Sequence, residues 1–506
     1  MRLRELATLP EILEVRGDLD VEVKGLASHS GRVQPGDLFV AVPGTAQDGH
    51  DYLQEAAQRG AVAAVVERFQ DPVCKTLTQL RVADSRRAMA HLAARFYGEP
   101  ANHLKLIGIT GTNGKTTTAH VLEAILEAAG HQVGVLGTIA YRWGGHVLPA
   151  SNTTPDSIEL QRLLAQMSRQ GISHVVMEVT SHALEQKRVL GCRFQVGIFT
   201  NLTRDHLDYH GSMEAYLEAK TTLFKEHLKS ESQGGWAFLN LHDPASPVIS
   251  QVCSSRVIWY GLGSEGDVKA LEWKGGRDGS RILLDFPEGR ISLESPLIGE
   301  PNVLNVVAAC GCAWALGVEP EKWREGIRRL KPVPGRMERI DGPDLPSGFT
   351  VLVDYAHTPD ALDRALATAR KLASAKLIVV FGCGGDRDRG KRPMMAQAAA
   401  RHCDLAVVTS DNPRNEEPMA IIQEIVKGFQ GTRLSRIDAH QSIDVPAYTI
   451  LEDRQEAIRW AVGHACPGDV VLIAGKGHEN YQILGNKRIP FDDREVARRA
   501  LLEKGP

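Results

Sequence analysis

Short apolar runs alternate with amphipathic stretches over the middle of the chain. Between about residues 98 and 334, the runs LKLIGIT, QVGVLGT, HVVMEVTS, VGIFTN and WAFLNL are separated by stretches such as SIELQRLLAQMSRQG, whose apolar residues recur at helical spacing. Nearly continuous apolar strands separated by helices predict a mostly parallel sheet that is covered on both faces. The run ALEWKGGRDGSRILLDF breaks this alternation and predicts an antiparallel hairpin.

A second α/β series follows the Pro- and Gly-rich stretch PVPGRMERI at residues 332–340. Its predicted strands are FTVLVDYAH, KLIVVFGCGG, LAVVTSDNPR and VVLIAGKGHENYQ, and helical patterns separate them. Residues 1–97 mix short strand-like runs with Gly- and Pro-rich turns, which predicts a small α/β unit. We therefore expect an α/β protein of three domains, 1–97, 98–334 and 335–506, in which the last two sheets enclose a cleft.

The stretch GITGTNGKTTTAH at residues 108–120 carries the clearest chemical signal. A predicted strand precedes it and a predicted helix follows it, which is the context of a phosphate-binding loop. The loop N–H groups and the helix dipole would face a polyphosphate, Lys115 would reach its β- and γ-phosphates, and Thr116 would offer its hydroxyl to Mg²⁺. The alternative, a glycine-rich turn with a surface lysine, is disfavoured because both flanks fit. Ile109 stands where the common GxxxxGK[ST] spacing has glycine, so generic GTPases and kinases are not favoured.

Composition narrows the class of protein. The 506 residues carry a formal net charge of −3, so no basic field indicates nucleic-acid binding. Apolar runs stay well below the roughly 20 residues of a membrane span, and the N-terminal residues lack the apolar stretch of a signal peptide. The 8 cysteines are scattered without a CxxC motif, which is typical of buried thiols in a reducing compartment. We expect a cytoplasmic protein.

Polar residues follow several predicted strands, where ligands bind in open α/β sheets. Glu178 follows HVVMEV, and His206 lies in NLTRDHLDYHG after another strand. Both are candidate Mg²⁺ ligands, although Mg²⁺ prefers oxygen and His206 is equally interpretable as an ordinary loop histidine. FGCGGDRDRGKR at 381–392 is either a functional loop or a solvated charged one. DNPR at 411–414 places a carboxylate and a guanidinium across a proline-fixed turn, a pair that suits a zwitterionic amino acid.

Taken in chain order, these motifs resemble the Mur ligase family. The matching stretches, which cover essentially the whole chain, are TGTNGKTTT, SNTTP, MEVTSHALEQKR, FTNLTRDHLDYHG, YLEAKTTLF, GEPNVLN, VPGRME, VDYAHTPDAL, FGCGGDRDRGKR, SDNPR and AGKGHE. Within the family, they are most similar to the members that add meso-2,6-diaminopimelate to UDP-N-acetylmuramoyl-L-alanyl-D-glutamate. The resemblance implies an N-terminal UDP-substrate-binding domain, a central ATP-binding P-loop domain and a Rossmann-like C-terminal domain that binds the amino acid.

The resemblance also implies the reaction, its cofactors and its partners. An ATP-dependent ligase of this kind forms an amide bond through an acyl phosphate and releases ADP and phosphate, in peptidoglycan synthesis and hence in cell-wall biogenesis, cell shape and cell division. The implied cofactors are ATP, two Mg²⁺ ions and a CO₂-derived carbamate on Lys220. The implied partners are the three small-molecule substrates, with no nucleic acid and no membrane span, and we expect a monomer.

Site residues are implied only where this sequence matches the family's motifs. The matches to the ATP site are Gly111, Thr112, Asn113, Gly114, Lys115, Thr116, Thr117, Asn302, Asn305, Arg336, Asp354 and His357. The matches to contacts with the UDP-muramoyl dipeptide are Ser28, Ser30, Thr45, Ala46, Gln47, Asn152, Thr153, Thr154, Thr180, Gln186 and Arg188. The matches to the diaminopimelate site are Arg387, Asp411, Asn412, Pro413, Arg414, Gly475 and Glu479.

The implied metal ligands are Thr116, Glu178, His206 and carbamylated Lys220, and the implied catalytic residues are Lys115, Lys220, His206 and Glu178. Without the resemblance, Lys220 would be interpreted as an exposed helix lysine. Two positions depart from the family pattern. The uridine loop often reads DSR but is His29-Ser30-Gly31 here, and Thr180 stands where serine is frequent.

Four alternatives remain at this point. A lysine-adding ligase of the same family typically lacks the arginine of DNPR, so Arg414 favours a substrate with a second carboxylate. A ligase similar to folylpolyglutamate synthase shares the TGTNGK-type loop but not DNPR or the uridine-type N-terminal domain. A regulatory P-loop ATPase would hydrolyse nucleotide without an amino acid. A structural assembly protein with a degenerate nucleotide site is disfavoured because Lys115, Thr116, Glu178 and His206 are all present.

Overall fold

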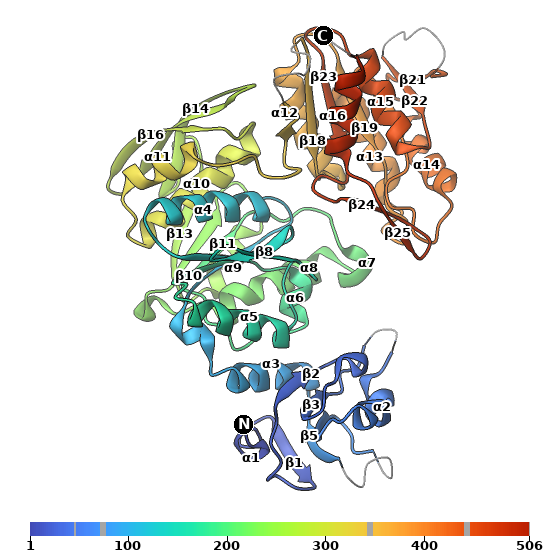
Figure 1. Cartoon of the computed structure of the whole chain (residues 1–506). Helices are drawn as coiled ribbons and strands as arrows, with labels where there is room; N and C mark the ends of the chain where they lie inside the picture. Colours follow the sequence, from blue (N-terminus) through green and yellow to red (C-terminus); the bar gives the residue numbers. More distant parts are fainter. Residues whose placement is uncertain (45–46, 71–76, 342–347, 440–445, 505–506) are drawn as a thin grey trace.

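The computed structural model describes residues 1–44, 47–70, 77–341, 348–439 and 446–504. Figure 1 shows three successive parts, with the N-terminal part at one end, the C-terminal part at the other and the central part between them. Each part has its own β-sheet with helices packed on it. The predicted α/β class is confirmed, whereas the domain boundaries at about residues 97 and 334 remain a prediction.

The N-terminal sheet forms from the short strand-like runs of the first part. Over the described residues its order is β1-β5-β4-β3-β2, and only β1 is antiparallel to its neighbour. Its strands are β1 (Ile12–Arg16), β2 (Gly25–Ala27), β3 (Asp37–Val40), β4 (Ala63–Val66) and β5 (Thr78–Val82). Its helices are α1 (Leu3–Leu6), η1 (Ser30–Arg32), η2 (Gly49–Tyr52), α2 (Leu53–Gln58) and α3 (Ser85–Phe96). Successive strand residues face opposite sides, so Leu38 joins the core with α3 and Phe39 joins the core with α2.

The central sheet has the order β16-β15-β14-β13-β12-β11-β6-β10-β7-β8-β9 in the described part of the chain. The strands from β14 to β7 in this order are parallel, and antiparallel strands extend both edges. Its strands are β6 (Lys105–Thr110), β7 (Val133–Leu136), β8 (Ala140–Trp143), β9 (His146–Pro149), β10 (His174–Glu178), β11 (Val196–Phe199), β12 (Trp236–Asn240), β13 (Arg256–Leu262), β14 (Val268–Gly276), β15 (Gly279–Phe286) and β16 (Gly289–Ser295). The β14–β15 pair confirms the predicted hairpin.

Helices cover both faces of this sheet, as the continuous apolar strands predict. Helices α4, α10 and α11 pack together in one core that includes Ile107 and Ile109 of β6, whereas Leu106 of the same strand belongs to the opposite core with α5. The helices are η3 (Pro100–His103), α4 (Lys115–Ala128), α5 (Ser157–Arg169), α6 (Ser181–Glu185), α7 (Leu207–His210), α8 (Met213–Thr222), η4 (Leu223–His227), η5 (Glu231–Gln233), α9 (Ser246–Val252), α10 (Glu300–Ala315) and α11 (Pro320–Arg328).

The C-terminal sheet has the order β17-β18-β23-β19-β20-β22-β21 over the described residues, and only β17 is antiparallel to its neighbour. Its strands are β17 (Glu338–Arg339), β18 (Thr350–Asp354), β19 (Leu377–Phe381), β20 (Leu405–Val408), β21 (Ser435–Arg436), β22 (Ala447–Ile450) and β23 (Val470–Ala474), and a separate hairpin consists of β24 (Tyr481–Leu484) and β25 (Lys487–Pro490). The helices are α12 (Pro359–Leu372), α13 (Lys391–His402), α14 (Pro418–Val426), η6 (Lys427–Phe429), α15 (Arg454–His464) and α16 (Asp493–Lys504).

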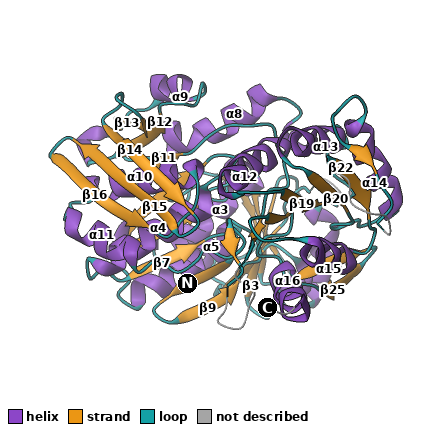
Figure 2. Cartoon of the chain, turned by 90° about the horizontal axis from the view of Figure 1, so that it is seen from above, coloured by secondary structure: helices purple, strands orange, loops and turns teal. Residues whose placement is uncertain are grey.

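Two hydrophobic cores hold the C-terminal helices on opposite faces of this sheet. Along β19, Leu377, Val379 and Phe381 face the core that contains residues of α12, α13 and α14, whereas Ile378 and Val380 face the core with α15 and α16. Figure 2, seen from above, shows α12, α13 and α14 on one side of these strands and α15 and α16 on the other. The parallel strands therefore send their carboxyl-end loops to one edge of the sheet.

Among the helices described, none combines the length and apolarity needed to cross a lipid bilayer.

Candidate active site

A glycine-rich loop joins β6 to α4, and its backbone needs glycine. Gly111 has a φ of 142°, and a Cβ atom there would lie 1.9 Å from Oγ1 of Thr200. Ile109, which replaces the common glycine, lies inside β6 and is fully buried in the core. The variant spacing thus has a structural reason, because position 109 belongs to the strand and the turn begins after it.

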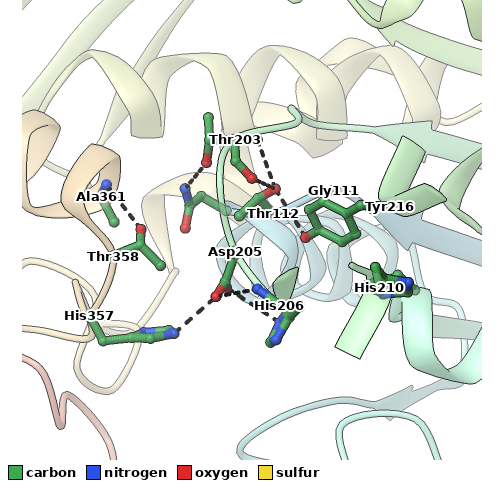
Figure 3. Close-up of polar contacts among 12 residues, drawn as sticks. Gly111, Thr112, Thr203, Asp205, His206, His210, Tyr216, His357, Thr358 and Ala361 are labelled. Atoms are coloured by element: carbon green, nitrogen blue, oxygen red, sulfur yellow. Dashed lines mark hydrogen bonds and ion pairs between the residues drawn. The ribbon is translucent and has the colours of Figure 1, made fainter. Parts of the chain in front are cut away.

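Bonds from the neighbouring strand end hold this loop in shape. The N–H of Thr112 donates to the carbonyl of Asn201 at 2.8 Å, and the Thr200 hydroxyl donates to the carbonyl of Asn113 at 2.6 Å. The Thr112 hydroxyl lies between the Thr203 carbonyl and the Tyr216 hydroxyl, at 3.2 Å from each. Figure 3 shows these contacts around Thr112. The loop is therefore preorganised before any ligand arrives.

Two lysines converge on one carbonyl of the loop. Nζ of Lys115 and Nζ of Lys220 each donate to the Gly111 carbonyl at 2.9 Å. Lys220 is only 1% exposed on α8, and its Nζ lies 4.5 Å from the centre of the Tyr216 ring. Burial and the positive charge of Lys115 bring the pKa of Lys220 well below its ordinary value. The interpretation of Lys220 as an exposed lysine from pattern alone is therefore wrong, and burial disfavours the charged form of its amine.

A buried carboxylate lies beside the start of α4. Glu178, at the end of β10, is 2% exposed, and its Oε2 accepts hydrogen bonds from the hydroxyls of Thr116 at 2.9 Å and Thr138 at 3.0 Å. Arg336, which comes from the start of the C-terminal part, donates to the Thr116 hydroxyl at 3.2 Å. Carboxylate and hydroxyl oxygens next to a phosphate loop are the donors that Mg²⁺ uses together with phosphate oxygens.

His206 begins α7 with a left-handed backbone, at a φ of 54°. Its Nε2 lies 3.3 Å from Oδ2 of Asp205, and the same oxygen lies 3.8 Å from Nε2 of His357 across the boundary between the central and C-terminal parts (Figure 3). Within the described ranges, His, Cys, Asp and Glu side chains do not gather in threes that could hold a metal ion by themselves. The donors beside the loop, the Thr116 hydroxyl and the Glu178 carboxylate, are oxygens, and such a donor set would suit Mg²⁺.

A cavity of about 730 Å³ opens between the central and C-terminal parts. The phosphate loop, the carboxyl ends of β10 and β11, the start of α10 and the loop after β18 all line it. The predicted site residues among its lining are Thr112, Asn113, Gly114, Lys115, Thr116, Thr117, Asn152, Thr153, Thr154, Glu178, Thr180, Arg188, His206, Asn302, Asn305, Arg336, Asp354, His357 and Arg387. The structure therefore brings together residues that lie almost 300 positions apart.

The predicted nucleotide contacts on α10 form a short chain of amides. Nδ2 of Asn305 donates to Oδ1 of Asn302 at 3.1 Å, and Nδ2 of Asn302 donates to the Ile298 carbonyl at 2.8 Å. Oδ1 of Asn305 accepts the hydroxyl of Thr118 on α4, which ties the two helices together beside the loop. Asp354 accepts a hydrogen bond from the backbone N–H of Met337 at 2.7 Å. This bond fixes the segment that leads from the central part into the C-terminal part.

The predicted UDP-substrate residues divide into two groups. In the central part, Thr154 donates to the Glu178 carbonyl at 2.8 Å, and Arg188 donates both to the Thr154 carbonyl at 2.9 Å and to Oε1 of Gln186 at 2.8 Å. The Thr180 side chain caps α6, so its hydroxyl already has a structural partner. The residues of the second group lie in the N-terminal part and are Ser28, Ser30 and Gln47. Thr45 and Ala46 lie outside the described residues.

The predicted amino-acid residues gather at the carboxyl ends of β20 and β23. Asn412 donates to Oε2 of Glu479 at 2.9 Å, and the Arg414 guanidinium donates to the Gly385 carbonyl at 2.7 Å. Arg414 has a left-handed backbone, with a φ of 53°. Asp411 and Pro413 are buried in the same turn, and Gly475 directly follows β23, which β19 separates from β20 in the sheet. Parallel strands of one sheet thus bring two distant motifs together at their carboxyl ends.

Several residues of these networks were not among the predicted site residues, including the following four. Thr138 bonds Glu178, Asp205 faces two histidines, Tyr216 supports the phosphate loop, and Lys476 lies among the amino-acid residues. Thr138, at the end of the run QVGVLGT, could have been found as a polar residue at a strand end. Lys476 stands inside AGKGHE, but no local pattern indicates its burial.

Comparison with known proteins gives the chain its family. Residues 22–97, 109–313 and 335–477 match models described as "Mur ligase family, catalytic domain", "Mur ligase middle domain" and "Mur ligase, glutamate ligase domain". The chain belongs to the Mur ligase family.

Curated relatives and solved structures in this family match over nearly the full length. A Geobacter metallireducens protein named UDP-N-acetylmuramoyl-L-alanyl-D-glutamate–2,6-diaminopimelate ligase is 48% identical over 515 residues, with 100% of each chain covered. A Geobacillus thermodenitrificans protein of the same name is 46% identical, with 99% of each chain covered. A solved structure of a ligase with this name aligns with a TM-score of 0.68 at 32% identity, covering 99% of this chain and 98% of the other. The Mur ligase resemblance of the sequence motifs is thereby confirmed.

Proposed function

We propose that this Mur ligase adds meso-2,6-diaminopimelate to UDP-N-acetylmuramoyl-L-alanyl-D-glutamate in peptidoglycan synthesis, using ATP and releasing ADP and phosphate. The observation that carries the proposal is the cavity of about 730 Å³ in which the phosphate loop faces residues of the C-terminal part. The names of the full-length relatives support the choice of substrates. We further propose that the protein is a cytoplasmic monomer, as its resemblance to the family implies.

The first chemical step is attack of the substrate's γ-carboxylate on the γ-phosphoryl group of ATP, which forms an acyl phosphate and releases ADP. Lys115 and the loop N–H groups would offset the repulsion between two anions, since the preformed loop needs little reorganisation. Thr116 and Glu178, with His206 beside them, are the proposed holders of Mg²⁺, which when bound neutralises phosphate charge. In the second step the amine of diaminopimelate attacks the acyl carbon, and phosphate leaves.

Lys220 is proposed to carry a carbamate. Its uncharged amine would attack the carbon of CO₂, forming an N–C bond and losing a proton, so that a buried amine becomes an anion. The position fits this change because the Lys115 ammonium bonds the same Gly111 carbonyl and would stabilise a neighbouring negative charge. The carbamate would then help to position a second Mg²⁺.

The amino acid is proposed to bind at the turn formed by residues 411–414. Arg414 would receive the carboxylate at the far end of diaminopimelate, and Asp411 and Glu479 would receive its ammonium. Arg387 lines the cavity and would guide the reacting end of the amino acid. A substrate without the second carboxylate, such as lysine, would leave the Arg414 guanidinium without an anionic partner.

The requirement for each substrate tests the proposed function. ADP release should need the UDP-muramoyl dipeptide and diaminopimelate together, and lysine in place of diaminopimelate should support it poorly. A coupled ADP assay with each substrate omitted in turn measures this directly. Nucleotide hydrolysis that proceeds equally well without an amino acid would instead indicate a regulatory ATPase.

Replacing Arg414 by alanine should raise the KM for diaminopimelate by about 10- to 100-fold. The reason is the loss of a charged hydrogen bond to the substrate, which contributes about 1.5–3 kcal/mol to binding. The KM for ATP should stay within about twofold, because the side chain lies in the amino-acid group and not beside the loop. Steady-state kinetics with each substrate varied gives both constants. Arg401→Ala, on the exposed side of α13, is the matched control. Equal rises in both KM values would contradict the assigned role.

A further inference from the structure

Lys476 is a fully buried ammonium in the proposed amino-acid site. It follows β23, has an exposed fraction of 0%, and its Nζ lies 3.4 Å from Oδ1 of Asp411, 3.1 Å from Oδ1 of Asn412 and 3.2 Å from Oε2 of Glu479. One cation thus contacts three of the residues proposed to bind the amino acid. The chemistry described above assigns it no role.

Lys476 determines how Asn412 is turned. The Oδ1 atom of Asn412 accepts from Lys476 and from the N–H of Ile483 at 3.0 Å, so two donors require the oxygen on this side. The Nδ2 atom is thereby directed to Glu479, to which it donates at 2.9 Å. Oε2 of Glu479 thus accepts hydrogen bonds from both Nδ2 of Asn412 and Nζ of Lys476. Removing the ammonium would leave both carboxylates without this shared donor and would leave Oδ1 of Asn412 with the Ile483 N–H alone.

Lys476 also sets the charge of the site. Asp411 and Glu479 supply two carboxylates, and the charges of Lys476 and Arg414 offset them, so these four side chains together carry no net charge. Arg454 does not change this balance, because it is buried against Asp493 with hydrogen bonds of 2.8 and 2.7 Å. Burial alone would raise the pKa of Asp411, but the charges of Lys476 and Arg454 hold that pKa below its ordinary value.

We propose that Lys476 is a positioning residue of the amino-acid site, which orients Asp411, Asn412 and Glu479 and keeps the site from carrying an excess negative charge. This inference rests on the proposed function, because it assumes that these residues bind the incoming amino acid. Its consequence is selectivity by charge. A site without net charge matches the far end of diaminopimelate, which carries one ammonium and one carboxylate. A site without Lys476 would have one excess negative charge and would attract a more cationic amino acid such as lysine.

The charge-removing variant Lys476→Met tests the proposal with little change in side-chain volume. Its KM for diaminopimelate should rise by about 10-fold or more, while its KM for ATP stays within about twofold. Its preference for diaminopimelate over lysine, measured as the ratio of kcat/KM values, should fall by about 10-fold. Lys476→Arg keeps the charge and should retain most of that preference. Lys427→Met, at an exposed lysine of the same part, is the control and should behave as wild type.

The outcomes separate this inference from the proposed function. Wild-type ADP release that needs no amino acid would overturn both. Wild-type dependence on diaminopimelate together with an unchanged preference in Lys476→Met would overturn only the role of Lys476, and so would equal rises in the KM values for ATP and diaminopimelate. Thermal melting and ADP binding report whether the variants fold. If Lys476→Met is unfolded, Lys476→Gln replaces it, because glutamine keeps hydrogen-bond donors without the charge. The same fall in the preference for diaminopimelate over lysine is then expected, and an unchanged preference would overturn the role of Lys476.

Discussion

Replacing Lys115 by alanine should abolish ADP release, with a loss of at least about 10²- to 10³-fold in kcat. Nζ of Lys115 donates to the carbonyls of Gly111 and Thr112 at 2.9 Å each, so its charge lies against the backbone of the loop. In the proposed reaction this charge stabilises the transferring phosphoryl group, and no other lysine of the cavity lining identified above could replace it. The measurement is ADP production with saturating substrates.

Lys105→Ala is the matched control for this variant. Lys105 is an exposed residue at the opposite end of the same strand, β6, and its removal should leave the rate unchanged. The backbone of the loop is held by Asn201 and Thr200 independently of Lys115, so the variant should fold and melt close to wild type. If Lys115→Ala kept more than about a tenth of wild-type activity, the phosphate-loop assignment would be contradicted, because removal of a group that stabilises transition-state charge should lower kcat much further.

Lys220→Ala should be nearly inactive, and a short-chain carboxylate such as acetate should restore part of its activity. The cavity left by the side chain is buried and lies beside Lys115, so a small anion could occupy the place of the proposed carbamate. The measurement is ADP release by the variant with increasing acetate or propionate, beside wild-type enzyme assayed with and without CO₂. The fall in kcat should again be about 10²-fold or more.

Lys225→Ala, an exposed lysine five positions away in η4, controls for the loss of a positive charge in this region. Wild-type enzyme that keeps full activity after CO₂ is removed would refute the carbamate. A Lys220→Ala variant that folds but gains nothing from carboxylates would show instead that the lysine acts through its hydrogen bond to the Gly111 carbonyl. The two results separate a chemical role for Lys220 from a structural one.

Polar residues at the ends of apolar runs allowed site residues to be predicted from the sequence. Glu178 could be predicted as a site residue because it ends an apolar run, and in parallel sheets such ends lie together. The resemblance to the Mur ligases supplied what local patterns could not, including the roles of Asn302, Asn305 and Arg336 on elements far from the loop. The assignment of these residues to ATP remains a proposal, whereas the membership of the family is established.

Sequence by itself determined the local elements, the glycine-rich loop, the mostly parallel central sheet and the family. It did so because apolar periodicity and glycine spacing act over a few residues, and helices and strands follow from them. Only the tertiary structure decided the environment of the charged groups. The sequence around Lys220 and Lys476 does not indicate that these side chains are buried. Both are buried because a distant segment packs against each, about 110 residues earlier in the chain for Lys220 and about 65 residues earlier for Lys476. Burial and partners set the charge of an amine, and these are properties of the fold.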